Sequence, residues 1–316
     1  MTSKIGIGLI GCGAWGSNHA RIYNEIDNAY LVGVLDINPI TSINISNKYP
    51  NCKSFPDLES MLSNSDIDAV SICTPTNTHY PISRQAINSS KHCLIEKPVT
   101  NSVEQATELK KIAEEKNVQL QAGFIERFNP AVKQAVRMVK EGFIGKLVAT
   151  HHRRLSPGPK RKMYVGVISD IMIHEFDIAS LFGKIVKICG ETYKKENNEY
   201  EVYALSLLEY DNKGHGCIES SLINPSKVRS LDILGESGCI NIEYLNQDVY
   251  IQRDADNRQI WFHKEEPLKI ELESFVNNII NNTPVSPNIN DGINTLKICE
   301  SFRKSSLKGL PLKVEY

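Results

Sequence analysis

The sequence lacks the features that mark several large classes of protein. Its eight cysteines are scattered and form no C-x-x-C pair, so neither a disulfide framework nor a thiolate zinc site is indicated. No apolar run approaches the length of a membrane span, and a strand pattern begins at Ile5, which leaves no room for a signal peptide. The formal net charge is only -1, which implies no bulk attraction to nucleic acid or anionic membrane. We therefore expect a soluble, cytoplasmic protein without nucleic-acid or membrane partners.

The chain is long enough for about two domains. It has 316 residues, of which 41% are hydrophobic and 23% charged, ordinary values for a globular protein. Over the first part, apolar strand patterns alternate with helix patterns, which predicts a parallel sheet with helices on both faces. The expected strands are 5–10, 30–36, 67–73, 92–95 and 118–122, and the expected helices are 17–24, 57–62, 81–89 and 102–117.

The pattern changes near residue 123. A helix is expected at 129–142, a strand at 146–154 and a helix at 170–182. Repeated strand patterns with turns then fill about 185–262, and two helices at 268–282 and 291–308 follow. Hairpin spacing of this kind predicts an antiparallel or mixed sheet. The expected domains are thus residues 1–123 and 124–316.

Three glycines follow the first strand pattern at the spacing G-x-G-x-x-G. These are Gly11, Gly13 and Gly16. In a dinucleotide-binding turn the first glycine allows the tight turn, the second lets the backbone approach a pyrophosphate, and the third lets the next helix pack closely. Glycines also gather in ordinary turns, so the context decides. The stretch that we expect to hold a cofactor is 11–16, which includes Ala14 and Trp15.

An acidic residue supplies that context. Asp36 ends the second strand pattern, twenty positions after Gly16, where a dinucleotide fold places the carboxylate that binds the adenosine ribose. A carboxylate there would also repel a 2′-phosphate. We therefore expect NAD, with NADP less favoured; the competing interpretation of Asp36 is a turn residue ahead of Pro39.

Polar residues gather where later strands of the first domain end. One group is the expected loop 74–79 with its hydroxyls and amides, and the other is Glu96-Lys97-Pro98. In open parallel sheets the ligand binds at this edge. A lysine there can act as a general acid or base, and a following proline, in a cis bond for instance, would fix its direction. The alternative for Glu96-Lys97-Pro98 is a solvated surface turn.

The second candidate segment is the helix pattern that begins at Asp170. On an α-helix Asp170, His174 and Asp177 share one face, and almost every other position is apolar. Such a helix is buried, so its polar stripe needs partners. The three side chains either satisfy one another or line a pocket and handle protons and hydroxyls. No further ligand set stands out, so no metal is expected.

The most basic stretch precedes that helix. It contains Arg153, Arg154 and residues 160–162. A run of this kind is usually a solvated face, but here it leads into the Asp170 helix and could hold an anionic group such as a diphosphate. Arg127 and Asn129 follow the last parallel strand, where they could meet cofactor or substrate or merely cap the next helix.

Taken together, these motifs resemble those of the Gfo/Idh/MocA oxidoreductases, over essentially the whole chain. The most specific part is Glu96-Lys97-Pro98 combined with Asp170 and His174. The resemblance implies an NAD(P)-binding Rossmann domain, then an α+β domain with a large open sheet that commonly forms dimers or tetramers. It implies hydride transfer at a sugar or cyclitol carbinol, with Lys97 and His174 as the proton-transfer pair and Asp170 as a partner of the substrate and of Lys97. The cofactor would be lined by Thr74, Pro75, Asn77, Glu96 and Lys97.

A narrower resemblance concerns the substrate. Residues 126–130, Arg153-Arg154 and 165–177 look like those of nucleotide-sugar 3-dehydrogenases, which act on UDP-N-acetylglucosamine or its uronic acid and feed an aminotransferase. We expect substrate contacts from Arg127, Asn129, Arg153, Arg154 and Asp177 in these segments, and from His79 in the polar loop 74–79. Val165-Gly166 stands where many relatives have paired glycines, which leaves the substrate open. An inositol or free-sugar dehydrogenase and a non-catalytic NAD(P)-binding regulator are the alternatives.

Overall fold

The computed structural model describes residues 4–158, 165–196 and 198–316. The chain divides into two compact units, Met1–Ile125 with Glu266–Ile293, and Glu126–Glu265 with Asn294–Tyr316. The sequence-based division placed all of 124–316 in the second domain, but helix α8 (Pro267–Ile280) belongs to unit 1. The reason is packing: Leu272 and Phe275 lie in the same core as Leu9 and Tyr23.

The described residues of unit 1 form a six-stranded parallel sheet, which confirms the predicted Rossmann arrangement. Its order is β3-β2-β1-β4-β5-β6, the order of a doubly wound dinucleotide-binding fold. All six residues of β1 are buried, as expected for a strand covered on both faces. The strands are β1 (Ile5–Ile10), β2 (Ala29–Leu35), β3 (Lys53–Ser54), β4 (Ala69–Ile72), β5 (His92–Glu96) and β6 (Leu120–Gly123).

Two helices of unit 1 begin earlier than the sequence pattern indicates. Helix α1 (Ala14–Glu25) starts directly after Gly13, and α4 (Thr76–Asn88) contains residues 76–79 of the expected loop 74–79. The prediction took Pro81 as the first residue of a helix, whereas Pro81 lies inside α4. Helices therefore begin immediately after β1 and β4, at the edge of the sheet where ligands bind. The other helices are α2 (Pro39–Ser46), α3 (Leu58–Leu62) and α5 (Val103–Lys116).

The described part of unit 2 is built around a nine-stranded sheet, which confirms the predicted large, mostly antiparallel sheet. Its order is β14-β13-β12-β11-β7-β10-β9-β8-β15, and only β7 and β10 pair in parallel. The strands are β7 (Leu147–Pro157), β8 (Ile185–Tyr193), β9 (Tyr203–Tyr210), β10 (His215–Ser221), β11 (Ile223–Gly235), β12 (Gly238–Glu243), β13 (Asp248–Arg253), β14 (Asp256–Ile260) and β15 (Leu312–Lys313).

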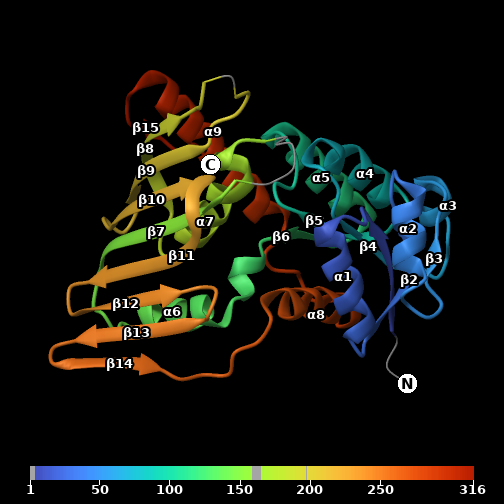
Figure 1. Cartoon of the computed structure of the whole chain (residues 1–316), viewed down its shortest axis with the longest axis horizontal. Helices are drawn as coiled ribbons and strands as arrows, with labels where there is room; N and C mark the ends of the chain where they lie inside the picture. Colours follow the sequence, from blue (N-terminus) through green and yellow to red (C-terminus); the bar gives the residue numbers. More distant parts are fainter. Residues whose placement is uncertain (1–3, 159–164, 197) are drawn as a thin grey trace. The chain divides into compact units, whose positions relative to one another are not determined.

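Helices cover one face of this sheet (Figure 1). Helix α6 (Pro130–Lys140) packs on β12 and β13, and α7 (Ile173–Ala179) packs on β7. Helix α9 (Ile289–Lys308) contacts α7 through Phe302 and Phe176, whose ring centroids are 5.7 Å apart. A short 3-10 turn, Ile125–Phe128, leads into α6. Among the described residues, no helix is long and apolar enough to cross a membrane.

Candidate functional site

The glycine turn after β1 has the geometry that close approach to a pyrophosphate requires. Gly11 has φ of +92°, and a Cβ there would lie 2.8 Å from the Cys73 carbonyl oxygen. A Cβ on Gly16 would lie 1.9 Å from the Gly11 oxygen, so α1 can pack on β1 only with glycine there. By contrast, a Cβ on Gly13 would meet nothing within 4 Å. Gly13 thus leaves open space beside the backbone, as expected for a turn that approaches a pyrophosphate.

Asp36 is held beside this turn. Its carboxylate accepts hydrogen bonds from the Cys12 amide at 2.7 Å and from the Asn38 amide at 2.8 Å. A fixed acid at the end of β2 fits the ribose hydroxyls of NAD. Burial, and secondarily the charge of Asp36, raises the pKa of the Cys12 thiol to about 12. Cys12 therefore stays a protonated thiol that fills space in the turn.

His79 has a different position from the one expected for a substrate contact. Its side chain is buried, with Nδ1 2.8 Å from the Pro98 carbonyl oxygen and Nε2 2.7 Å from the Thr74 carbonyl oxygen. These contacts tie the segment after β4 to the segment after β5. His79 therefore has a structural position between the segments that follow β4 and β5. Because it lies in the first turns of α4, a loop interpretation of 74–79 could not reveal its burial.

Glu96 and Lys97 mark the end of β5. Glu96 is buried, its Oε1 lies 3.3 Å from Nε2 of His19, and its Oε2 accepts from the Lys97 amide at 3.3 Å. Burial alone would raise the pKa of Glu96, but hydrogen bonding to His19, reinforced by Trp15 and the charge of Lys97, holds it below its usual value. The Lys97–Pro98 bond is cis. A buried carboxylate therefore sits directly before the candidate catalytic lysine.

In unit 2, Asp170 lies on a π-helical turn, whereas the sequence predicted one continuous α-helix. The turn spans Ile168–Met172 and is followed by α7. The Ile173 amide bonds to the Ile168 carbonyl five residues back, and the extra residue changes the direction in which Asp170 projects relative to His174. Both side chains are partly exposed, while residues 171–173 and 175–179 are buried. Such π turns are frequent at functional sites.

Asp177 and Arg127 partner each other. The Arg127 Nε lies 2.8 Å from Oδ2 of Asp177, and Nη2 lies 2.6 Å from Oδ1. Asn129 caps α6 by accepting from the Ala131 amide at 3.0 Å. Asp177 and Asn129 are only 1% and 2% exposed. These three residues, expected at the substrate, instead fasten the 3-10 turn and α6 within unit 2.

Arg154 is likewise occupied within the protein. It is 4% exposed, with Nε 3.0 Å from Oε1 of Glu175 and Nη1 3.0 Å from Oε1 of Glu126. His152 Nδ1 lies 3.2 Å from the other oxygen of Glu175, and the Tyr244 hydroxyl donates to it at 3.3 Å. Burial would raise the pKa of Glu175, but the charge of Arg154 is the main influence that holds it low. We call Arg154, Glu126, Glu175, His152 and Tyr244 the buried ion network.

Arg153 lies on the opposite face of the sheet from Arg154. Its Nε is 3.1 Å from Oε2 of Glu219 on the neighbouring strand, and its side chain is 41% exposed. Successive residues of a strand point to opposite faces, so these two arginines cannot clamp one diphosphate together. Residues 160–162 lie outside the described residues. The expected basic clamp is therefore corrected: one arginine is buried in a network, and the other pairs across the open face.

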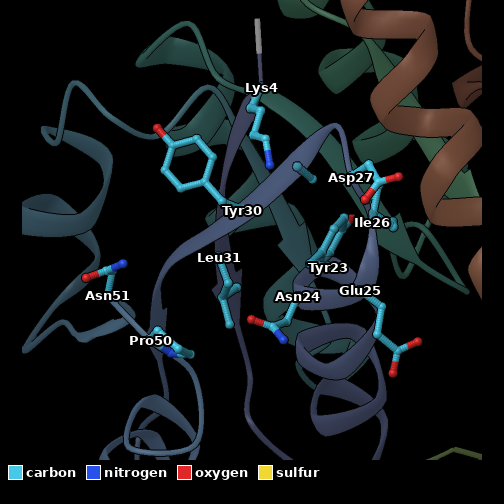
Figure 2. Close-up of a pocket in the computed structure, with 11 residues that line it drawn as sticks. Lys4, Tyr23, Asn24, Glu25, Ile26, Asp27, Tyr30, Leu31, Pro50 and Asn51 are labelled. Atoms are coloured by element: carbon cyan, nitrogen blue, oxygen red, sulfur yellow. The ribbon is translucent and has the colours of Figure 1, made fainter. Parts of the chain in front are cut away.

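Figure 2 shows a hollow in unit 1 that none of these candidate site residues lines. It has a volume of about 240 Å³ and is lined by Lys4, Glu25, Asp27, Tyr30 and Asn51 among others. Lys4 precedes β1 and Gly11 follows it, so the hollow lies at the amino ends of the strands. It is therefore distinct from the opposite edge of the sheet, at the carboxyl ends of the strands, where dinucleotides bind. Among the described residues, no group of three or more His, Cys, Asp or Glu side chains is placed to hold a metal.

Comparison with known proteins agrees with the two units. Residues 5–124 match the model of the GFO/IDH/MocA oxidoreductase family with an NAD-binding Rossmann fold, and residues 132–241 match the GFO/IDH/MocA C-terminal domain. The UDP-N-acetylglucosamine 3-dehydrogenase of Acidithiobacillus ferrooxidans is 30% identical over 88% of this chain and 90% of its own. The scyllo-inositol 2-dehydrogenase (NAD(+)) of Bacillus subtilis is 29% identical over 100% of this chain and 98% of its own.

Solved structures show the same fold. That of the Acidithiobacillus 3-dehydrogenase superposes with a TM-score of 0.87 at 27% identity, covering 96% of this chain and 97% of that one. A levoglucosan dehydrogenase in complex with NADH and levoglucosan gives a TM-score of 0.92 at 20% identity, over 99% of this chain and 100% of that one. The second likeness concerns the fold alone.

Proposed function

Because this chain belongs to the Gfo/Idh/MocA oxidoreductase family, we propose that it oxidises a hydroxyl of a nucleotide sugar to a keto group, with C3 of UDP-N-acetylglucosamine as the first substrate to test. The oxidoreductase class and the NAD cofactor follow from the family. The observation that carries the substrate proposal is the likeness to the Acidithiobacillus enzyme along most of both chains. The keto product would suit an aminotransferase as the next enzyme.

The proposed chemistry uses three side chains and the bound cofactor. Bound NAD supplies the hydride acceptor. Lys97, beside the buried Glu96, and His174, at the start of α7, are the proposed proton-transfer pair for the substrate hydroxyl. The Asp170 carboxylate on the π turn is proposed to accept a hydrogen bond from that hydroxyl and so fix its position. The Gly11–Gly16 turn and Asp36 hold the cofactor.

Substitution at Lys97 tests this mechanism directly. We expect Lys97→Ala and His174→Ala each to lower kcat by about a hundredfold or more, since a positioned acid–base group contributes that much. NADH formation with UDP-N-acetylglucosamine, followed by absorbance, measures the loss. Lys116→Ala, at an exposed lysine of α5, is the matched control. Near-normal turnover by Lys97→Ala would reject the mechanism.

A cyclitol dehydrogenase is the second candidate, and the likeness to the Bacillus inositol dehydrogenase favours it. The two candidates share the same chemistry and differ in the substrate. A panel of UDP-sugars, myo-inositol and scyllo-inositol, scored by kcat/KM at fixed NAD, separates them. Reduction of NAD only with the inositols would replace the nucleotide-sugar proposal.

We also propose that the chain assembles with a second copy of itself through the open face of the unit 2 sheet, the face opposite α6 and α7. Leu205 and Leu207 are exposed, whereas the intervening Ser206 is buried. Cross-strand pairing places Tyr193 on the same face, and Leu234 and Tyr250 on the far strands. An apolar surface mixed with paired charges such as Arg153 and Glu219 suits association with a like surface. Light scattering should show an oligomer that Leu207→Asp dissociates, and a monomeric wild type would reject this proposal.

A further inference from the structure

Arg229 is a cation that the sequence pattern did not single out. It lies on β11 directly opposite Arg154 of β7. Residues that are directly opposite in an antiparallel pair project from the same face of a sheet. Because Arg154 reaches Glu175 of α7, this is the face that α7 covers. Arg229 therefore lies on the sheet face covered by α7, which carries His174 and directly follows the π turn that carries Asp170.

The two neighbouring arginines have very different partners. Arg154 pairs with two carboxylates, Glu126 and Glu175. Arg229 donates from Nη1 only to backbone oxygens, at 2.6 Å to Leu155 and 2.9 Å to Val228. No carboxylate of the described residues lies within 4 Å of its guanidinium nitrogens, and the segments outside the described residues contain no Asp or Glu. Nη2 and Nε have no hydrogen-bond acceptor among the described residues.

The surroundings of Arg229 disfavour its charge. Removal from water, and next the positive charge of Arg154, lower the pKa of Arg229 to about 10. The charges of Glu175, Glu126 and Asp170 act in the opposite direction without contacting it. A guanidinium in this position gains from an anion that accepts two parallel hydrogen bonds. Because Arg229 lies opposite Arg154, whose partner Glu175 directly follows His174, that anion would bind in the neighbourhood of the proposed catalytic histidine.

We propose that Arg229 binds an anionic group of the sugar substrate, either a carboxylate or a phosphoryl group, through its free guanidinium edge. This inference rests on the proposed sugar dehydrogenase activity and narrows its substrate class to negatively charged sugars. It differs from the clamp expected from Arg153 and Arg154, whose guanidiniums are committed to glutamates. A neutral inositol would leave Arg229 without a partner.

Calorimetry with the intact protein and NADH tests the proposal independently of turnover. UDP-N-acetylglucosamine carries the phosphoryl group, glucuronate carries only the carboxylate, and myo-inositol carries neither. We expect Arg229→Gln to weaken binding of one anionic probe by about 10- to 100-fold, the value of a charge-assisted hydrogen bond, and to leave myo-inositol unchanged. The affected probe identifies the group. Arg229→Lys, which keeps the charge but not the planar fork, should lose less.

Two controls make the outcome decisive. Arg258→Gln removes an exposed arginine of β14 whose side chain is 62% exposed, and it should change no affinity. Thermal unfolding of Arg229→Gln checks that it folds, and Arg229→Lys replaces it if it does not. Unchanged affinity of both variants for both anions would overturn the proposal. If wild type binds an anionic probe through Arg229 but oxidises no sugar, the proposed function fails while the anion site stands.

Discussion

Nε of Arg154 lies 3.0 Å from Oε1 of Glu175, the residue that follows His174. This pair joins the central strand β7 to α7, the helix that carries the proposed catalytic His174. Both side chains are almost fully buried, so each stabilises the charge of the other. Glu126 also contacts Arg154, and His152 also contacts Glu175. Arg154, which was expected to contact the substrate, thus holds α7 against β7 through Glu175.

Glu175→Gln should destabilise the protein strongly. Leaving a buried charge wholly uncompensated costs about 3–5 kcal/mol, and the loss here should lie somewhat below that range because Glu126 still contacts Arg154. Urea unfolding measures the change in the free energy of unfolding. Glu219→Gln is the matched control, because its partner Arg153 is 41% exposed and an exposed pair contributes about 0–1 kcal/mol. Equal losses in the two variants would contradict the role of the buried ion network.

Alanine substitutions within the glycine turn should separate cofactor binding from folding. Gly13 has φ of -65° and open space at its Cβ position, so Gly13→Ala should fold normally. Its methyl group would enter the phosphate cradle, and we expect NAD affinity to fall about tenfold or more. Gly16→Ala would overlap the Gly11 oxygen and should lose about 1–3 kcal/mol of stability or more. Calorimetry and thermal unfolding measure the two effects. Unaltered NAD affinity in Gly13→Ala would argue against the assigned cradle.

The glycine turn and the strand ends were predictable because they depend on local conformation and on a topological rule. Gly11 and Gly16 have backbone positions that reject any Cβ, and parallel strands present their carboxyl ends at one edge. The alternation of Arg153 and Arg154 across the sheet also follows from the predicted strand. The sequence spacing does not reveal, however, that Arg153 pairs with Glu219 and that Arg154 pairs with Glu175.

The remaining features depend on contacts between distant parts of the chain. The burial of Glu175 with Arg154, and of His79 between two carbonyl groups, follows from tertiary packing. The π turn adds one residue to a sequence that reads as a continuous α-helix, so the shift of Asp170 is invisible to helical periodicity. Arg229 was overlooked because its neighbours in the sequence show no motif, and only the pairing of β11 with β7 places it beside Arg154.

Asp36 should control the choice between NAD and NADP. Its carboxylate is fixed by the Cys12 and Asn38 amides, where it can accept from ribose hydroxyls and repel a 2′-phosphate. Asp36→Asn keeps an oxygen acceptor and removes the charge. We expect NAD to bind about 10- to 100-fold more weakly, the value of a charge-assisted hydrogen bond, and NADP to gain. Titration of both cofactors measures the ratio, and an unchanged preference would remove Asp36 from cofactor selection.

His92 should make the protein less stable in mild acid. The Gln119 amide donates to Nδ1 of His92 at 2.9 Å, which requires that nitrogen to be unprotonated. Burial lowers the pKa of His92 below its ordinary value, and the charge of Asp68 opposes this only in part. Well above about pH 6.5, the ordinary pKa of histidine, the ring is neutral in both folded and unfolded chains, so it adds no pH dependence. Below that pH the unfolded chain binds the proton more readily, and the free energy of unfolding falls until the folded ring is protonated too.

The variant His92→Asn isolates this contribution, because its side-chain oxygen can still accept from the Gln119 amide but does not titrate. Urea unfolding between pH 7.5 and 5 should show a shallower loss of stability in His92→Asn than in wild type, by at most about 1.4 kcal/mol per pH unit for one proton. His215→Asn removes an exposed histidine and should follow the wild-type curve. Other buried groups, His79 among them, contribute equally to wild type and both variants, so only the difference between curves reports on His92. If the His92→Asn curve ran parallel to wild type, the hydrogen bond to Gln119 would not govern the protonation of this ring.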